Sequence, residues 1–209
     1  MKDCWKKKEK TQKTVKSIGI AGAIRGSGAT HLSVALANYA ASGLGEKTAC
    51  LELGGHGELA HWKAVNQKGY FTDAKIHYYP DFKKEQIPVL INCAYEKIIM
   101  DFGDAYISCQ GELLRCDRKI VLLNLNPWQE FTAKRMIERI QSGEWGNAVP
   151  VYASVNAVKA IKKSIEREYR ISIAEIPLIP NPACVSQEAF SCMNFLSGHD
   201  VKYYKKKKL

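Results

Sequence analysis

Apolar residues fall into short continuous runs that alternate with stretches of helical spacing. The continuous runs predict buried strands at residues 15–21, 48–53, 89–93, 98–101, 119–125, 149–155 and 173–179. Helical spacing predicts a helix at 30–41, one that carries Ala133, Met136, Ile137 and Ile140, one that carries Val158, Ile161, Ile165 and Tyr169, and one at 187–196.

The order of these elements predicts the fold class. Continuous apolar strands alternating with amphipathic helices are typical of a mostly parallel sheet covered by helices on both faces. We therefore expect an α/β fold with three layers. Residues 60–88 are the least regular part of the chain.

The charge of the chain belongs to its two ends. The formal net charge is +10, and residues 1–16 and 201–209 each contribute +5, which leaves 19 basic and 19 acidic side chains between them. We expect a basic N-terminal arm at 1–14, one domain at 15–197 and a basic C-terminal tail at 198–209. Such tails suit DNA or an anionic membrane, or they are solvated ends that aid solubility.

The sequence gives no sign of export or of metal-binding cysteines. No apolar stretch approaches the roughly 18 residues that a membrane span needs. The seven cysteines are scattered without a C-x-x-C pair, so they predict ordinary reduced thiols. We expect a cytoplasmic protein, with peripheral attachment to membrane or nucleoid through the tails as a further option.

The segment at residues 18–31 reads as strand, glycine turn and helix, in the order that aims backbone N–H groups at phosphate. A dinucleotide G-x-G-x-x-G pattern fails because His31 stands where the third glycine belongs. A phosphate loop fits better. The plain alternative is a strand-to-helix turn with Thr30 near the N-cap.

Residues 21–37 resemble the deviant phosphate loop K-G-G-x-G-K-T and following helix of the ParA/MinD P-loop ATPases. Gly26 and Gly28 match the loop glycines, and Thr30 matches the magnesium-binding threonine. The resemblance extends over about residues 16–197. It implies a P-loop NTPase-like fold, ATP or ADP with Mg as ligand, and a homodimer.

Three positions depart from that pattern, and two of the departures remove positive charge. Ile24 replaces the signature lysine, Ala29 replaces the phosphate-loop lysine, and Arg25 replaces a glycine. Those lysines offset charge on the phosphates and on the transition state, so their loss predicts weak binding and little hydrolysis. Arg25 offers partial compensation, since a guanidinium binds phosphate well.

Two acidic motifs of the family are kept in part. Glu52 stands for the first acid after the second strand, whereas Gly54 replaces the second, which organises the attacking water. Asp101 matches the Walker B aspartate, which holds magnesium through water. We expect it beside Thr30 at the carboxyl edge of the sheet. Asn156 resembles the asparagine that contacts adenine.

These matches define the expected site. Thr30 and Asp101 would hold Mg, and nucleotide would lie against Ile24, Arg25, Gly26, Ser27, Gly28, Ala29, Thr30, His31 and Asn156. We expect His31 and His56 to be surface or cap residues, because neither has a carboxylate partner at meaningful spacing.

Three functions stay open. The first is a pseudo-ATPase or weak nucleotide-binding scaffold that positions a partner complex; its degenerate loop resembles those of the TadZ/CpaE-like localisation proteins, and it either binds nucleotide or has no cofactor. The second is an atypical Mg-ATPase that uses Arg25 or a partner's residue. The third is a DNA- or membrane-binding module that acts through the lysine-rich tails.

Overall fold

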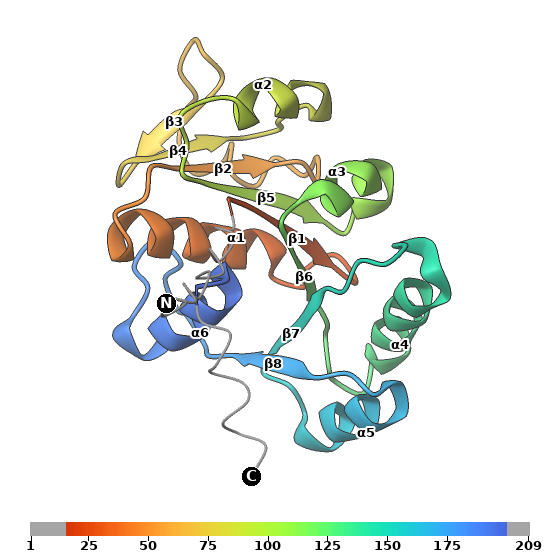
Figure 1. Cartoon of the computed structure of the whole chain (residues 1–209). Helices are drawn as coiled ribbons and strands as arrows, with labels where there is room; N and C mark the ends of the chain where they lie inside the picture. The colour runs from red at the N-terminus through yellow and green to blue at the C-terminus, as the bar shows by residue number, and fades with distance from the viewer. Residues whose placement is uncertain (1–15, 200–209) are drawn as a thin grey trace, which may run out of the picture.

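A computed structural model describes residues 16–199, so the basic arm and most of the basic tail lie outside the described residues. One sheet runs through the molecule in the order β3-β4-β2-β5-β1-β6-β7-β8 (Figure 1). Its neighbours pair in parallel except β3 with β4. The strands are β1 (Ser17–Gly22), β2 (Thr48–Glu52), β3 (Phe71–Asp73), β4 (Ile76–Tyr79), β5 (Lys97–Gly103), β6 (Arg118–Leu122), β7 (Val151–Val155) and β8 (Ile173–Ile176).

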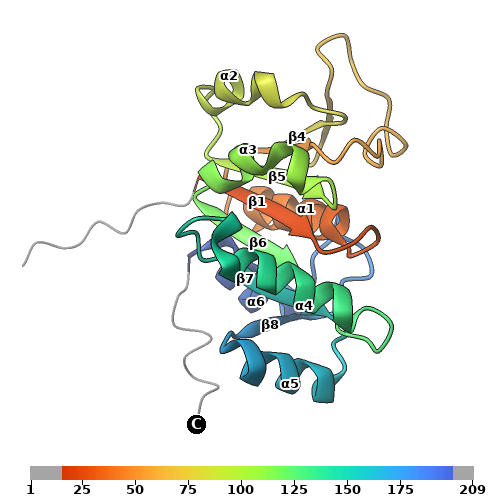
Figure 2. The same cartoon turned by 90° about the vertical axis from the view of Figure 1, so that its right-hand side faces the viewer.

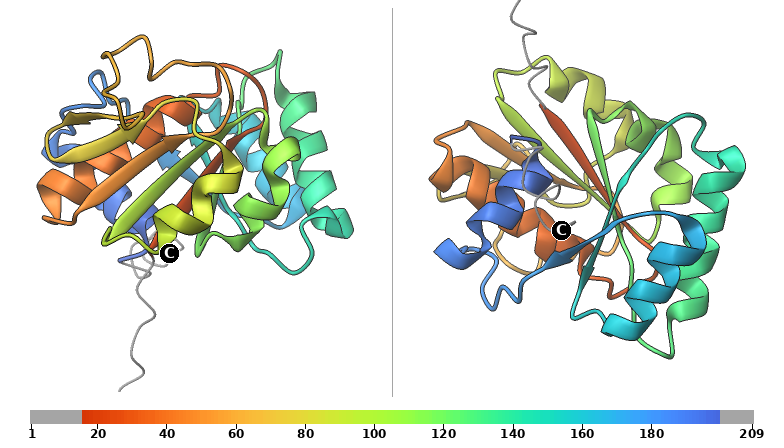
Figure 3. Two further views of the ribbon diagram at one scale, coloured as in Figure 1. Left: turned by 90° about the horizontal axis from the view of Figure 1, so that it is seen from above. Right: turned by 60° about the horizontal axis from the view of Figure 1, so that its bottom comes forward.

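Helices cover both faces of this sheet, which confirms the predicted three-layer α/β fold. On one face lie α1 (Ala29–Asn38) and α6 (Phe190–Ser197). On the other lie α2 (Ile87–Ile91), α3 (Gln110–Arg115), α4 (Glu130–Arg139) and α5 (Lys159–Tyr169). Figure 2 shows α3, α4 and α5 in front of the strands, and the right panel of Figure 3 shows the two layers on either side of them.

The central strand β1 is buried on both faces. Ile18 and Ile20 pack into the core beneath α1 and α6. Gly19 faces α3, and a Cβ at this position would lie 2.6 Å from Leu113 Cδ1. Only glycine therefore lets α3 approach the strand this closely.

The predicted strand at 89–93 is wrong, because Ile87–Ile91 forms helix α2. Ile87 and Leu90, three residues apart, are buried, whereas Val89 between them is 71% exposed. That spacing is helical, but a five-residue apolar run is too short for periodicity to distinguish helix from strand. Helix α3 was not anticipated either.

The segment predicted to be irregular contains the β3–β4 hairpin. Its two turn residues, Ala74 and Lys75, both have positive φ, 45° and 68°. This is the geometry of a turn that Asn-Gly normally signals, and Ala-Lys gives no such signal. The hairpin is held instead by pairing of β4 with β2 and by burial of Tyr78, whose hydroxyl accepts a hydrogen bond from Asn38 at 2.9 Å.

The remaining boundaries differ from the prediction by a few residues. Helix α1 continues into a π-helical turn at Tyr39–Gly43, and β5 runs on past Asp101 to Gly103 because Phe102 is buried. Short 3₁₀ turns occupy Lys84–Gln86, Tyr106–Cys109 and Gln187–Ala189, and a second π-helical turn Ile140–Glu144. Between residues 16 and 199, no helix is both long and apolar enough to cross a membrane.

Candidate functional site

A glycine-rich loop joins β1 to α1 at the carboxyl edge of the sheet. Gly26 and Gly28 have φ of 77° and 91°, and a Cβ at either position would meet nothing within 4 Å. The N–H of Ser27 donates to the carbonyl of Ile24 at 3.2 Å, which closes the turn. The Ser27 hydroxyl folds back to within 2.0 Å of where a Cβ of Gly22 would lie. The loop therefore exposes bare backbone, as phosphate binding requires.

Thr30 and Asp101 lie together beside this loop. β1 and β5 are neighbours in the sheet, and Ile20 is the register partner of Asp101. The Thr30 hydroxyl hydrogen-bonds the Asp101 carboxylate, which also accepts the N–H of Gly103 at 3.0 Å. The expected proximity of these two oxygen donors is confirmed. Their roles as magnesium ligands stay a prediction.

Asp101 is only 1% exposed, and this burial dominates its electrostatics. Loss of water raises the pKa of Asp101 to about 6, although the hydrogen bonds from Thr30 and Gly103 oppose the change and the carboxylate of Glu52 adds to it. An ionised carboxylate at this position is costly without a cation. Oxygen ligands of this kind are those that Mg²⁺ prefers, with phosphate and water completing its shell.

The two residues that match the acidic motif after β2, Glu52 and Gly54, both make structural contacts. The Glu52 carboxylate accepts the N–H groups of Glu58 at 2.6 Å and Leu59 at 3.1 Å, so it fixes the loop after β2. Gly54 lies against β5, where an added Cβ would be 3.4 Å from the carbonyl oxygen of Phe102. An added Cβ at position 54 would therefore be in ordinary van der Waals contact with its neighbours.

The three positions that differ in charge are placed differently. Ala29, the first residue of α1, is 5% exposed and faces the core, and Ile24 is half-buried. Arg25 is exposed, and within residues 16–199 it makes no hydrogen bond or ion pair. No positive side chain is therefore held against the loop in the described structure.

A pocket of about 330 Å³ opens beside the loop. Asn156, which ends β7 with φ of 53°, faces it from the opposite side. It is lined by Gly26, Ser27, Gly28, His31, Leu32, Leu123, Asn124, Val155, Asn156, Ile176, Pro177, Leu178 and Ile179. The structure thus brings together the loop glycines, His31 and Asn156, whereas Ile24, Arg25, Ala29 and Thr30 do not line this pocket. No lysine or arginine is among its described walls.

The two histidines beside the site have defined partners. His31 Nε2 lies 2.7 Å from the carbonyl oxygen of Ile179, so it ties α1 to the segment after β8. His56 Nε2 lies 2.7 Å from Asp104 Oδ1. Both histidines are exposed, as expected, and the carboxylate partner of His56 comes from the loop after β5, 48 residues away in the sequence.

Asn124, at the end of β6, is a pocket residue that the sequence did not reveal. Its Oδ1 atom is buried and has no hydrogen-bond partner in the described residues. A buried acceptor without a partner is costly, and a ligand with an N–H or O–H group would satisfy it. The signal available was its position two residues before the Asn126-Pro127 turn.

Comparison with known proteins identifies the fold. No protein-family model matches the sequence, and no curated protein matches it. Solved structures match at low identity but over nearly their whole length. MinD from Aquifex aeolicus is 17% identical with a TM-score of 0.63, and the match covers 89% of this chain and 98% of that one.

Two further structures were solved with nucleotide analogues. A plasmid partition protein from Borrelia burgdorferi bound to AMPPNP is 12% identical (TM-score 0.62; 93% and 100% covered). A cobyrinic acid a,c-diamide synthase from Mycobacterium smegmatis with bound ATP analogue and magnesium is 10% identical (TM-score 0.64; 93% and 97% covered). The chain has the fold of the ParA/MinD-type P-loop ATPases.

Proposed function

We propose that this chain is a nucleotide-binding scaffold of the ParA/MinD type that hydrolyses ATP little or not at all. One observation carries the proposal: the loop, the Thr30–Asp101 pair and the pocket are assembled, yet no lysine or arginine lines the pocket. The shape for a phosphate ligand is kept while the charge that drives phosphoryl transfer is missing.

The residues present fit a Mg-nucleotide. The open backbone at Gly26 and Gly28 would hold phosphate, and Thr30 with Asp101 would hold the metal. Asn156 and the buried acceptor of Asn124 offer polar groups to the rest of the nucleotide. Bound magnesium would supply the positive charge that neutralises the phosphates, since no lysine or arginine among the described residues lines the pocket.

The same residues do not favour hydrolysis. Transition-state charge in phosphoryl transfer is stabilised by preorganised cations, and positions 24 and 29 hold aliphatic side chains. Gly54 has no group to position a water. A scaffold that changes its partner contacts on binding nucleotide needs none of these, so we assign the chain a role in positioning or regulating a partner complex.

The second candidate is an active Mg-ATPase completed in trans. It is favoured by the side chain of Arg25, which is exposed at the edge of the loop. A second protein could hold the Arg25 guanidinium against the phosphates or supply a cation of its own. Turnover that appears only with a partner would support this candidate.

Calorimetric titration with Mg-ATP and Mg-ADP tests the proposal, with released phosphate measured in parallel. We expect saturable binding with a dissociation constant on the order of 10–100 μM and phosphate release at background. Gly26→Ala should abolish binding, whereas Gly45→Ala, which has the same kind of positive φ (73°) and open surroundings, should not. No binding at 1 mM, or ordinary turnover by the chain alone, would overturn the proposal.

A further inference from the structure

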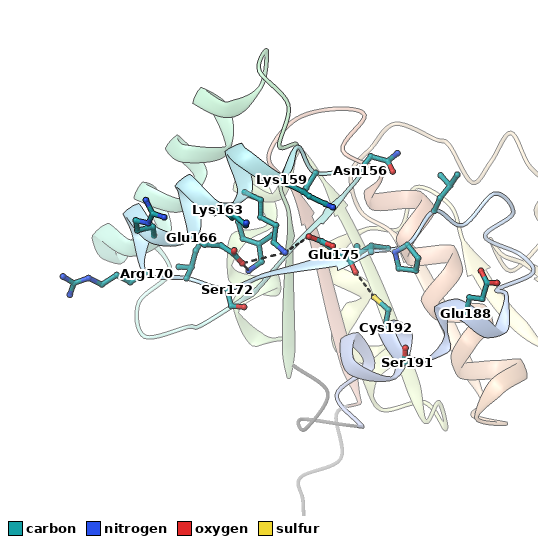
Figure 4. Close-up of a pocket in the computed structure, with 18 residues that line it drawn as sticks. Asn156, Lys159, Lys163, Glu166, Arg170, Ser172, Glu175, Glu188, Ser191 and Cys192 are labelled. Carbon is teal, nitrogen blue, oxygen red and sulfur yellow. Dashed lines mark hydrogen bonds and ion pairs between the residues drawn. The ribbon is translucent and has the colours of Figure 1, made fainter. Parts of the chain in front are cut away.

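A groove of about 1160 Å³ lies at the β8 edge of the sheet, between α5 and α6 (Figure 4). We name it the α5–α6 groove, and it is bounded by Lys159 and Lys163 on α5, Arg170 directly after α5, Glu175 on β8, and Ser191 and Cys192 on α6. In the described sheet β8 pairs with β7 on one side only, so its other side borders the groove. The nucleotide pocket does not include these six residues.

One wall of the groove is a row of cations. Lys159, Lys163, Arg167 and Arg170 are exposed, and none has a hydrogen bond or ion pair among residues 16–199. A spacing of four residues places Lys159, Lys163 and Arg167 along one side of α5, over about 12 Å at 1.5 Å per residue, and Arg170 follows directly after the helix. Lys162 differs, because its ammonium lies 2.7 Å from Glu175 and 4.0 Å from Glu166.

The floor of the groove is a strand edge with apolar residues. The N–H of Ile173 donates to Glu166 at 2.8 Å, and the carbonyl of Glu175 accepts the Cys192 thiol at 3.7 Å. Residues 173 and 175 therefore turn their backbone groups toward the groove, in the alternation of a strand. Pro177 and Leu178, the latter 67% exposed, extend the apolar surface toward Asn156.

From these features we infer that the α5–α6 groove docks an extended segment of a partner protein in which acidic and apolar residues alternate. Every second residue of an extended segment lies about 6.7 Å apart, close to the 6 Å between cations four residues apart on α5. Acidic side chains would meet that row, and apolar ones the floor. The N–H of Ile173 and the carbonyl of Glu175 already have partners in the chain, so side chains rather than full strand pairing would hold the segment along this edge.

Charge also decides against other occupants. The chain's own ends, residues 1–15 and 200–209, are rich in lysine and would be repelled by α5. A nucleic acid presents a continuous row of phosphates, and these would meet the carboxylates of Glu166, Glu175 and Glu188 in the same groove. Separate acidic side chains can pair with the cations and avoid those carboxylates.

The groove and the nucleotide pocket share four wall residues: Asn156, Ile176, Pro177 and Leu178. A segment that fills the groove up to Leu178 would therefore end beside the nucleotide pocket. The groove itself is formed without nucleotide, so this inference does not depend on nucleotide binding.

The test uses the fluorescein-labelled peptide Asp-Val-Asp-Ile-Asp-Val-Asp and the full chain, with binding followed by fluorescence anisotropy. A second peptide has the same composition with the four acids together at one end, and a 12-nucleotide oligothymidine serves as the nucleic-acid probe. The variant Lys163→Glu/Arg167→Glu reverses the middle of the cation row. Lys68→Glu/Arg115→Glu changes the net charge equally on distant exposed sites.

We expect the alternating peptide to bind the wild type with a dissociation constant below about 1 mM, and the groove variant to lose about tenfold or more. The control variant should lose less than about twofold, with both variants unfolding cooperatively near the wild-type temperature. The inference is overturned if the alternating peptide does not bind, if the block peptide binds equally well, or if the two variants lose affinity alike. Tighter binding of oligothymidine that the groove variant abolishes would assign the groove to nucleic acid instead.

Discussion

The two sides of the proposed phosphate site differ in the chemistry that they offer. One side consists of open backbone at Gly26 and Gly28, which suits a phosphate. It also holds the paired oxygens of Thr30 and Asp101, which suit a cation. The other side consists of positions 24 and 29, where the family pattern has lysines. Here both residues are aliphatic, and Ala29 belongs to the core. Binding geometry depends on backbone and can persist, whereas catalysis depends on a few charges that single substitutions remove.

The largest expected effect is on turnover. If the charged side is truly absent, ATP hydrolysis by the chain alone should lie on the order of a thousandfold or more below that of an active phosphate-loop ATPase. A coupled phosphate-release assay measures it. Turnover in the ordinary range, lost in Asp101→Ala, would show that Arg25 replaces the missing lysines and that the two sides are both intact.

The next effect is on the free energy of unfolding, which the buried carboxyl of Asp101 lowers. The folded carboxyl of Asp101 keeps its proton up to about pH 6, whereas the unfolded one releases it near pH 4, so the free energy of unfolding falls as pH rises between these values. Above pH 6 the loss is constant, about 3 kcal/mol for a shift of this size.

Asp101→Asn should therefore stabilise the nucleotide-free protein at pH 7 by an amount of that order and give no gain near pH 4. Urea unfolding at several pH values measures this, with Asp73→Asn, in an exposed ion pair with Lys63, as the control. The same substitution should weaken Mg-dependent nucleotide binding. If Asp101→Asn differed from the wild type by the same free energy of unfolding at both pH values, the pKa of Asp101 would not be raised by folding.

Restoring one charge would sharpen the comparison further. Ala29→Lys should bind ATP about tenfold more tightly than Ala29→Met, which adds a side chain of similar length without charge. The methionine variant separates the effect of charge from the effect of enlarging a buried position. Hydrolysis should not return in either variant while Gly54 remains. Full turnover from Ala29→Lys alone would show that position 54 is unimportant.

The smallest effect is expected at Asn156. Its left-handed backbone (φ 53°) is one that glycine adopts without strain, so Asn156→Gly should change the free energy of unfolding by less than about 0.5 kcal/mol. Loss of the side chain from the pocket should weaken nucleotide binding about fivefold, the value of one hydrogen bond. Asp81→Gly, also left-handed at 48° but outside the pocket, should leave affinity unchanged.

The sequence by itself determined the layered fold and the neighbours of the loop. Strands buried on both faces read as continuous apolar runs, and helices show one apolar stripe, so β1, β2, β5, β6, β7 and β8 could be predicted. The glycines of the loop could be predicted as well, because positive φ and bare backbone restrict residue type. Asp101 was expected beside Thr30 because carboxyl ends of parallel strands share one edge.

Tertiary structure decided the features whose stabilising contacts come from distant residues. The β3–β4 hairpin has no turn signal at Ala74–Lys75 and is held by β2, and α2 comes from an apolar run too short to show its period. His56 meets Asp104 only when two separate loops converge, and the oxygen of Asn124 is buried without a partner only in the packed fold. The pattern of a chain records which faces are buried, but pairings across many residues depend on the packed fold that brings those faces together.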